Sequence, residues 1–183
     1  MRIISGLAGG ISLSVPKGEV RPTTDRVREA LFSILHPLIK HADVLDLFTG
    51  SGAFGLEALS RGARTARMVD ASRASCTTAK ANLSKTGLEG GTVIQGDAVQ
   101  FVKRELTAGR KYDVVFADPP YCKGPLVEAG VAGLLKDDGV FIAEVQEGWG
   151  TGSEDSAGFD GLRLVDTRRY GKNMLLFYRL PKE

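Results

Sequence analysis

The feature that most constrains the fold is an alternation that starts at Asp43, where short apolar stretches take turns with segments long enough to form helices. The apolar stretches predict strands at 44–48, 65–70, 92–95, 112–118 and 140–145. The segments between them predict helices at 53–61, 72–85, 98–106 and 126–135. This order requires right-handed crossovers and a mostly parallel sheet with helices on both faces. Two closing stretches, 162–171 and 173–179, predict an antiparallel hairpin that completes a seven-stranded, doubly wound α/β fold.

A different pattern precedes this alternation. Residues 2–15 alternate apolar residues with polar or small ones around Gly9-Gly10, which predicts a small β-hairpin. In the stretch 21–35, RPTTDRVREALFSIL, the apolar residues fall at helical spacing, and Thr24 or Asp25 can supply the N-cap. Because the chain has no repeat and no low-complexity tract, we expect an N-terminal extension over 1–20 and one domain over 21–183.

The composition excludes several classes of protein. The 183 residues suit one domain, and 24 Lys and Arg nearly cancel 22 Asp and Glu, leaving a net charge of +2. The longest apolar run, Met174–Tyr178, is far shorter than the roughly 20 residues that cross a bilayer. The two cysteines and two histidines form no cluster with metal-ligand spacing. We therefore expect a cytoplasmic protein that binds neither a membrane nor a metal.

A glycine-rich turn follows the first predicted strand. Gly50, Gly52 and Gly55 satisfy the pattern G-x-G-x-x-G at the point where a strand gives way to a helix, and such glycines let the backbone approach a ligand closely. Asp70 ends the second predicted strand, where its carboxylate can accept hydrogen bonds from ribose hydroxyls. Dinucleotide enzymes and S-adenosylmethionine enzymes share this pair, and a plain strand-to-helix turn would also contain these glycines.

Two further aspartates stand at the carboxyl ends of predicted strands, where ligands bind in such sheets. Asp46 would repel a pyrophosphate but attract the ammonium and sulfonium groups of S-adenosylmethionine; it could also merely cap the turn. Asp97 can accept a hydrogen bond from an adenine amino group, or it can be the N-cap of the next helix. The first of these aspartates favours S-adenosylmethionine over a dinucleotide.

The motif DPPY, residues 118–121, ends the apolar fourth strand. In the usual doubly wound order the first and fourth strands are neighbours, so Asp118 is expected beside the glycine turn. Asp118 and the carbonyl of Pro119 can accept hydrogen bonds from an exocyclic amine of a nucleobase, and Pro119 and Pro120 stiffen that loop. Tyr121 offers a flat face for stacking an extruded base. A rigid loop that only ends the strand is the alternative.

Taken together, these segments resemble a known family. RPTTDRVREALF (21–32), DLFTGSGAFGLEALSRGA (46–63), GDA (96–98), DPPY and RRYGKNMLLFYR (168–179) are similar to the bacterial 16S ribosomal RNA guanine-N2 methyltransferases. The resemblance implies a Rossmann-like fold and methyl transfer from S-adenosylmethionine to the N2 amine of one guanine in 16S rRNA. It implies catalytic roles for Asp118, Pro119, Pro120 and Tyr121. It implies cofactor contacts for Thr24, Arg26, Asp46, Phe48, Gly50, Gly52, Asp70, Ala71, Asp97, Ala98 and Asp118.

The resemblance also implies a partner, 16S rRNA within a partly or fully assembled small ribosomal subunit, and we expect the protein to act as a monomer. The family's N-terminal hairpin usually carries several Lys or Arg, whereas this chain has none between Arg2 and Lys17. Phosphate contacts from this segment should therefore be fewer and less salt-dependent. Residues 1–42 carry six basic residues against three acidic ones, and residues 111–183 carry nine against twelve. RNA contact is expected near residues 21–29 and Arg61–Arg73.

Three other functions remain open from the residues alone. DPPY is equally suited to an adenine-N6 methyltransferase acting on DNA or RNA. The glycine turn also suits a nicotinamide-dependent oxidoreductase, although Asp46 and the lack of a second substrate domain disfavour it. A ribosome-assembly factor that keeps a cofactor fold without catalysis is the third. Cys122 can border the site, and Trp149 can stack on RNA or pack over the core edge.

Overall fold

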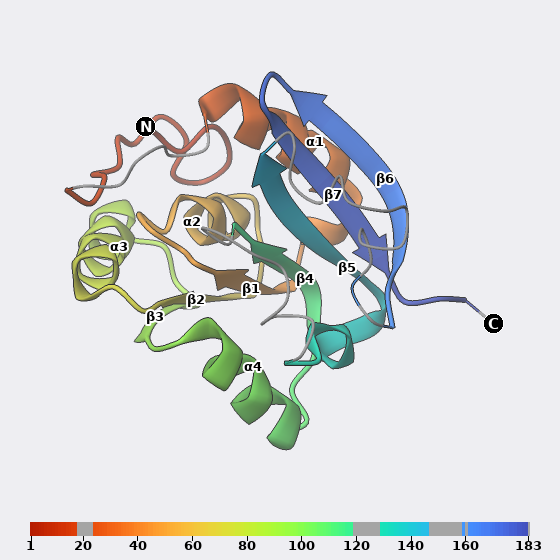
Figure 1. Cartoon of the computed structure of the whole chain (residues 1–183). Coiled ribbons are helices and arrows are strands. Elements are labelled where there is room, and N and C mark those ends of the chain that lie inside the picture. Colours follow the sequence, from red (N-terminus) through yellow and green to blue (C-terminus); the bar gives the residue numbers. More distant parts are fainter. Residues whose placement is uncertain (18–23, 119–128, 147–158, 160, 183) are drawn as a thin grey trace.

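The computed structural model describes residues 1–17, 24–118, 129–146, 159 and 161–182 of the chain. Within them a seven-stranded sheet has the order β3-β2-β1-β4-β5-β7-β6 (Figure 1). The strands are β1 (Asp43–Leu47), β2 (Thr65–Asp70), β3 (Gly91–Gln95), β4 (Tyr112–Ala117), β5 (Leu135–Gln146), β6 (Arg163–Tyr170) and β7 (Asn173–Arg179). The helices are α1 (Asp25–Ile39), α2 (Ala53–Ser60), α3 (Arg73–Thr86), α4 (Ala98–Thr107) and the short 3₁₀ turn η1 (Val131–Leu134).

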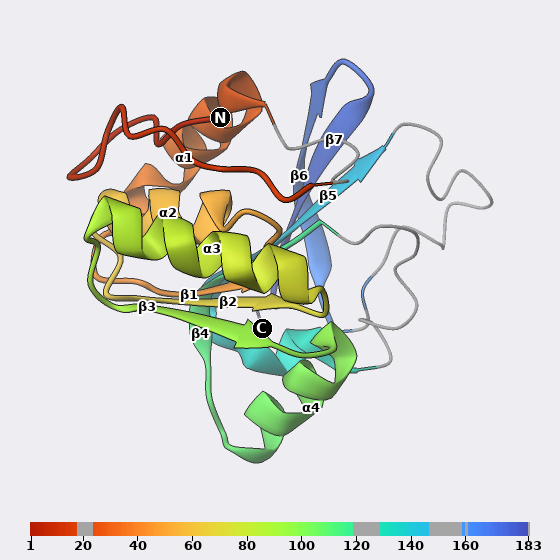
Figure 2. The same cartoon turned by 90° about the vertical axis from the view of Figure 1, so that its left-hand side faces the viewer.

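The sheet has the predicted topology. Strands β1 to β5 pair in parallel, whereas β7 pairs antiparallel with both β5 and β6. The closing hairpin turns at residues 171–172, as the sequence predicts. Helices α1, α2 and α3 lie on one face of the sheet and α4 on the other (Figure 2). The predicted Rossmann-like, doubly wound α/β fold is therefore confirmed, with β1 and β4 side by side at its centre.

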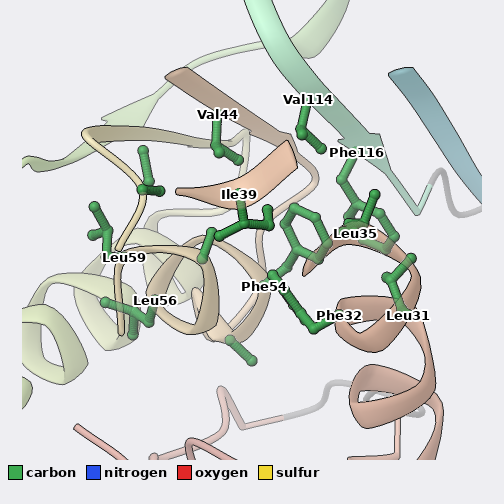
Figure 3. Close-up of a cluster of buried hydrophobic side chains, with 14 of the residues drawn as sticks. Leu31, Phe32, Leu35, Ile39, Val44, Phe54, Leu56, Leu59, Val114 and Phe116 are labelled. Carbon is green, nitrogen blue, oxygen red and sulfur yellow. The ribbon is translucent and has the colours of Figure 1, made fainter. Parts of the chain in front are cut away.

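The core on the α1 and α2 side holds the two helices against the central strands (Figure 3). Phe54 of α2 stacks on Phe116 of β4 with 4.1 Å between ring centroids, and it contacts Phe32 of α1 at 5.0 Å. Leu31 and Leu35 of α1 are also fully buried, because the apolar residues of this helix recur at three- and four-residue spacing. This packing fixes α1 directly above the carboxyl ends of the central strands.

The N-terminal segment differs from the predicted hairpin. Its only regular pairing among the described residues is a single bridge between Arg2 and Ser12. The backbone N–H groups of Ile4 and Ser5 instead donate to the carboxylate of Glu57 on α2, at 2.7 and 3.1 Å. The hairpin prediction was wrong because α2, rather than a second strand, satisfies these donors. The predicted boundary at residue 20 falls outside the described residues and stays a prediction.

The helix predicted at 126–135 is also corrected where the structure describes it. Residues 131–134 form only η1, and Leu135 already begins β5, where it pairs with Tyr112. Gly130 has a φ of +78°, which breaks a helix, and η1 lies against α4: a Cβ at Gly133 would stand 2.7 Å from a methyl group of Leu106. The other predicted elements agree with the structure to within a few residues. None of the helices described here combines the length and apolarity that crossing a membrane requires.

Candidate active site

The centre of the sheet places the ends of β1 and β4 next to each other. Leu47 pairs with Ala117, so the next residues, Phe48 and Asp118, leave the sheet side by side. Both line a cavity of about 50 Å³ that extends under α1 and α2. The other polar residues lining this cavity are Arg28, Asp46, Thr49 and Ser51. The sequence prediction that Asp118 lies beside the glycine turn therefore agrees with the cavity's lining.

Asp46 is the buried acid of the cavity, with 1% of its surface exposed. Its Oδ2 atom accepts hydrogen bonds from the Thr49 hydroxyl at 2.5 Å and from the Gly55 N–H at 3.2 Å. Burial raises the pKa of Asp46 to about 7, against the opposing effect of these two hydrogen bonds, and the charge of Asp70 raises it further. An ammonium or sulfonium group beside this carboxyl would favour its charged form.

The glycine turn is held by Asp70 at the end of β2. Asp70 accepts hydrogen bonds from the Gly50 N–H at 2.9 Å and from the Ser72 N–H at 2.8 Å. It therefore links the turn after β1 to the start of α3, while remaining half exposed at the strand end. Phe48 precedes the turn with a φ of +65°, an unusual conformation for a bulky residue and one that recurs at ligand sites.

Two glycines of the motif have separate structural causes. Gly52 adopts a φ of +82° at the N-cap of α2, which disfavours any side chain there. Gly55 lies so close to β2 that a Cβ atom would be 2.6 Å from Cγ of Met68. The first glycine therefore shapes the turn, and the second lets α2 pack directly on the sheet.

The ends of β2 and β3 carry the remaining predicted residues. Asp97 is exposed and is the N-cap of α4, accepting a hydrogen bond from the Gln100 N–H at 2.9 Å. The N-cap reading of this residue is correct, and an adenine contact through its exposed carboxylate stays a prediction. Ala98 is buried as the first residue of α4, whereas Ala71 is exposed between Asp70 and Ser72.

Comparison with known proteins decides the family. The family model described as Conserved hypothetical protein 95 matches residues 1–179. The Escherichia coli K12 protein named Ribosomal RNA small subunit methyltransferase D is 36% identical over 94% of this chain and 93% of its own length. The chain belongs to this family. The Escherichia coli structure of yhhF shares the fold with a TM-score of 0.82 and 34% identity, covering 98% of this chain and 97% of that one.

A more distant structure shares the fold alone. SMU.776, complexed with SAH, has a TM-score of 0.69 at 19% identity, over 85% of this chain and 48% of that chain. The resemblance noted from RPTTDRVREALF, DPPY and the closing hairpin thus identified the correct family.

The structure separates the family's predicted residues into three groups. Asp46, Phe48 and Asp118 line one cavity, and Gly50 and Gly52 belong to the adjoining turn. Pro119, Pro120 and Tyr121, together with Cys122 and Trp149, lie outside the described residues. Thr24 is the N-cap of α1, where it accepts from the Val27 N–H at 3.4 Å, and Arg26 is exposed; the cavity lining includes neither.

The helix instead contributes Arg28, which sequence reasoning missed. Arg28 is 2% exposed and lines the cavity together with Leu31. A signal was present in the sequence, since Arg28 stands three residues before Leu31 and four before Phe32, within the apolar stripe of α1. A charged residue on a stripe that faces the core needs a reason to be buried.

A larger cavity, of about 510 Å³, lies at the opposite edge, where β1, β2 and β4 begin. Arg67 and Arg110 line it, but both are paired with buried Glu105, and Tyr112 donates to the same carboxylate. Burial and Glu105 raise the pKa of Tyr112 well above its usual range. Ligands of doubly wound sheets bind at the carboxyl ends of the strands, so this cavity is not the candidate active site despite its size.

Proposed function

We propose that this protein transfers a methyl group from S-adenosylmethionine to the exocyclic N2 amine of one guanine in 16S rRNA. The coarser statement, methylation of ribosomal RNA with S-adenosylmethionine as cofactor, follows from the family and its named relatives. The finer statement rests on the sequence resemblance and on one observation: Asp118 and Asp46 line the same cavity.

The residues present fit the cofactor. Buried Asp46 is suited to a cationic group, Asp70 remains half exposed at the strand end, and the buried guanidinium of Arg28 has donor atoms without acceptors in the described chain. When bound, S-adenosylmethionine supplies an electrophilic methyl group on its sulfonium. A dinucleotide would bring a pyrophosphate toward the Asp46 carboxylate, which disfavours the oxidoreductase alternative.

The protein's own contribution is positioning. Asp118 accepts a hydrogen bond from the exocyclic amine, whose lone pair is otherwise delocalised into the base, and so holds the nitrogen in line with the methyl group. The carbonyl of Pro119 is proposed as a second acceptor and Tyr121 as the stacking surface for the extruded base. After transfer the nitrogen carries one extra proton, and Asp118 is the nearest acceptor for it.

We further propose that the substrate is 16S rRNA within a partly or fully assembled small subunit, and that the protein acts as a cytoplasmic monomer. The arginines expected to face RNA make ion pairs in the free protein: Arg61 pairs with Glu57, Arg64 with Asp43 and Arg67 with Glu105. RNA phosphates must compete with these carboxylates, which agrees with recognition of one structured site rather than general RNA binding.

The assigned role of Asp118 has a direct test. Small subunits that lack the modification are incubated with the protein and labelled cofactor, and transfer is measured for the wild type and for Asp118→Ala. We expect transfer to fall at least 100-fold while S-adenosylhomocysteine binding changes less than threefold. Asp166→Ala, on exposed β6, is the matched control and should keep full activity. Unchanged transfer by Asp118→Ala would remove this residue from the reaction.

A further inference from the structure

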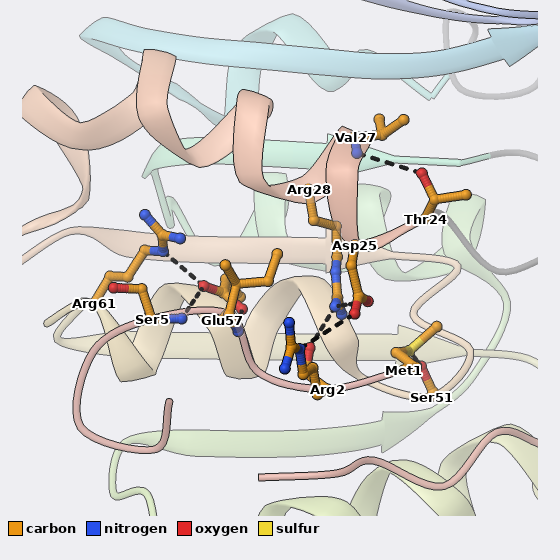
Figure 4. Close-up of polar contacts among 11 residues, drawn as sticks. Met1, Arg2, Ser5, Thr24, Asp25, Val27, Arg28, Ser51, Glu57 and Arg61 are labelled. Carbon is orange, nitrogen blue, oxygen red and sulfur yellow. Dashed lines mark hydrogen bonds and ion pairs between the residues drawn. The ribbon is translucent and has the colours of Figure 1, made fainter. Parts of the chain in front are cut away.

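Arg28 is buried with only part of its guanidinium satisfied (Figure 4). Its Nη2 atom donates to the carbonyl of Arg2 at 2.5 Å and to Oδ1 of Asp25 at 2.8 Å. Its Nε and Nη1 atoms have no acceptor among the residues that the structure describes. Buried donors are almost always paired in native proteins, and a guanidinium keeps its charge, so these two atoms indicate a missing acceptor.

The neighbouring carboxylates do not fill this role. Asp25 is bound to Nη2, and Glu57 accepts from Ile4, Ser5 and Arg61 instead. The contact with the carbonyl of Arg2 and the one with Asp25 also hold the guanidinium in place from two sides. Arg28 is thus fixed in position before any ligand arrives, which lowers the cost of binding one.

The cavity beside Arg28 restricts what the acceptor can be. It has room for a few atoms, about 50 Å³, and its lining places cationic Arg28 and anionic Asp46 in one small space. A cavity with one side chain of each charge complements a zwitterion, such as the carboxylate and ammonium of an α-amino acid. S-adenosylmethionine ends in such a group.

We propose that Arg28 binds the carboxylate at the amino-acid end of the cofactor through Nε and Nη1. Two parallel N–H donors match the two oxygens of a carboxylate, which gives both affinity and orientation. The proposal depends on the cofactor and not on which base is methylated, so it can fail while guanine-N2 transfer holds. An RNA phosphate has similar chemistry, but the carboxyl of Asp46 in the same cavity disfavours a second, larger anion.

The test compares two ligands that differ only at this end. S-adenosylhomocysteine carries the amino acid, whereas 5′-methylthioadenosine keeps the nucleoside and the sulfur without it. Calorimetry is done with the wild type, Arg28→Met and Arg28→Lys. We expect Arg28→Met to weaken S-adenosylhomocysteine roughly 10- to 100-fold and to leave 5′-methylthioadenosine within twofold. Arg28→Lys should recover part of the loss, because it restores the charge but not the paired donors.

The matched control is Lys40→Met, an exposed cation at the end of the same helix, which should change neither affinity. Thermal unfolding of each variant verifies that it is folded, and the ratio of the two affinities is insensitive to a small unfolded fraction. Equal loss of both ligands would assign Arg28 a structural role and overturn the proposal. Unchanged S-adenosylhomocysteine binding with weakened binding of small subunits would assign it to an RNA phosphate and would also overturn it.

Discussion

The buried acid of the cavity makes stability depend on pH in an unusual direction. Asp46 has a pKa of about 7 in the folded protein and an ordinary value of 3.8. Between these values the folded state holds a proton that the unfolded chain has lost, so the free energy of unfolding must fall as pH rises from about 4 to about 7. Replacing Asp46 with Asn removes this titration and should remove that part of the decline.

The size of the effect follows from the shift. A rise of about three pKa units, at 1.36 kcal/mol each, corresponds to about 4 kcal/mol lost by the wild type between pH 4 and pH 8. Asp46→Asn should therefore match the wild type near pH 4 and become more stable by about 2 to 4 kcal/mol at pH 8. Its affinity for S-adenosylhomocysteine should fall, because the buried charge that destabilises the free protein is what attracts the ligand's ammonium group.

Urea unfolding at pH 4.5, 6, 7 and 8 measures this difference. Asp43→Asn is the matched control, because ion pairing with Arg64 and Lys136 lowers the pKa of Asp43 to about 2. Its stabilising contribution is complete above pH 4 and is lost only as the pH falls toward 2, so its effect should stay constant over the tested range. A difference between Asp46→Asn and wild type that does not change from pH 4.5 to pH 8 would refute the reasoning.

Two further substitutions test how the site is supported. Gly55→Ala should destabilise the protein by about 1 to 3 kcal/mol, because its Cβ would meet Met68, whereas Gly96→Ala, with open space around it, should stay within about 0.5 kcal/mol; chemical denaturation distinguishes them. Glu57→Gln should cost about 3 kcal/mol and speed hydrogen exchange at the first amides of the chain, whereas exposed Glu29→Gln should do neither; equal exchange in both variants would contradict this anchoring.

The sequence predicted the central architecture well because its signals are local. Apolar strands, glycine turns and helical spacing each act over a few residues, and the rule for parallel crossovers then fixed β1 beside β4 and so Asp118 beside the turn. The N-cap roles of Thr24 and Asp97 were also within reach, since a capping side chain binds an amide only three residues away.

The failures concern contacts between distant residues. The alternation at 2–15 is that of a hairpin, but its amides are satisfied by Glu57, more than 50 residues away, and no local pattern carries that information. Arg28 was missed in favour of Arg26 because both lie in one charged stretch, and only the packing of α1 determines which of them is buried. Helix and sheet can be predicted from spacing, whereas the partner of a buried polar group requires the fold.

The central claim is methyl transfer to the N2 amine of a guanine in 16S rRNA. Small subunits lacking the modification are incubated with the wild-type protein and cofactor carrying a labelled methyl group. The 16S rRNA is then digested to nucleosides, and the labelled product is identified and mapped by mass spectrometry. The account predicts N2-methylguanosine as the labelled nucleoside, at one position of the rRNA. Labelled N6-methyladenosine, or no labelled nucleoside at all, would contradict it.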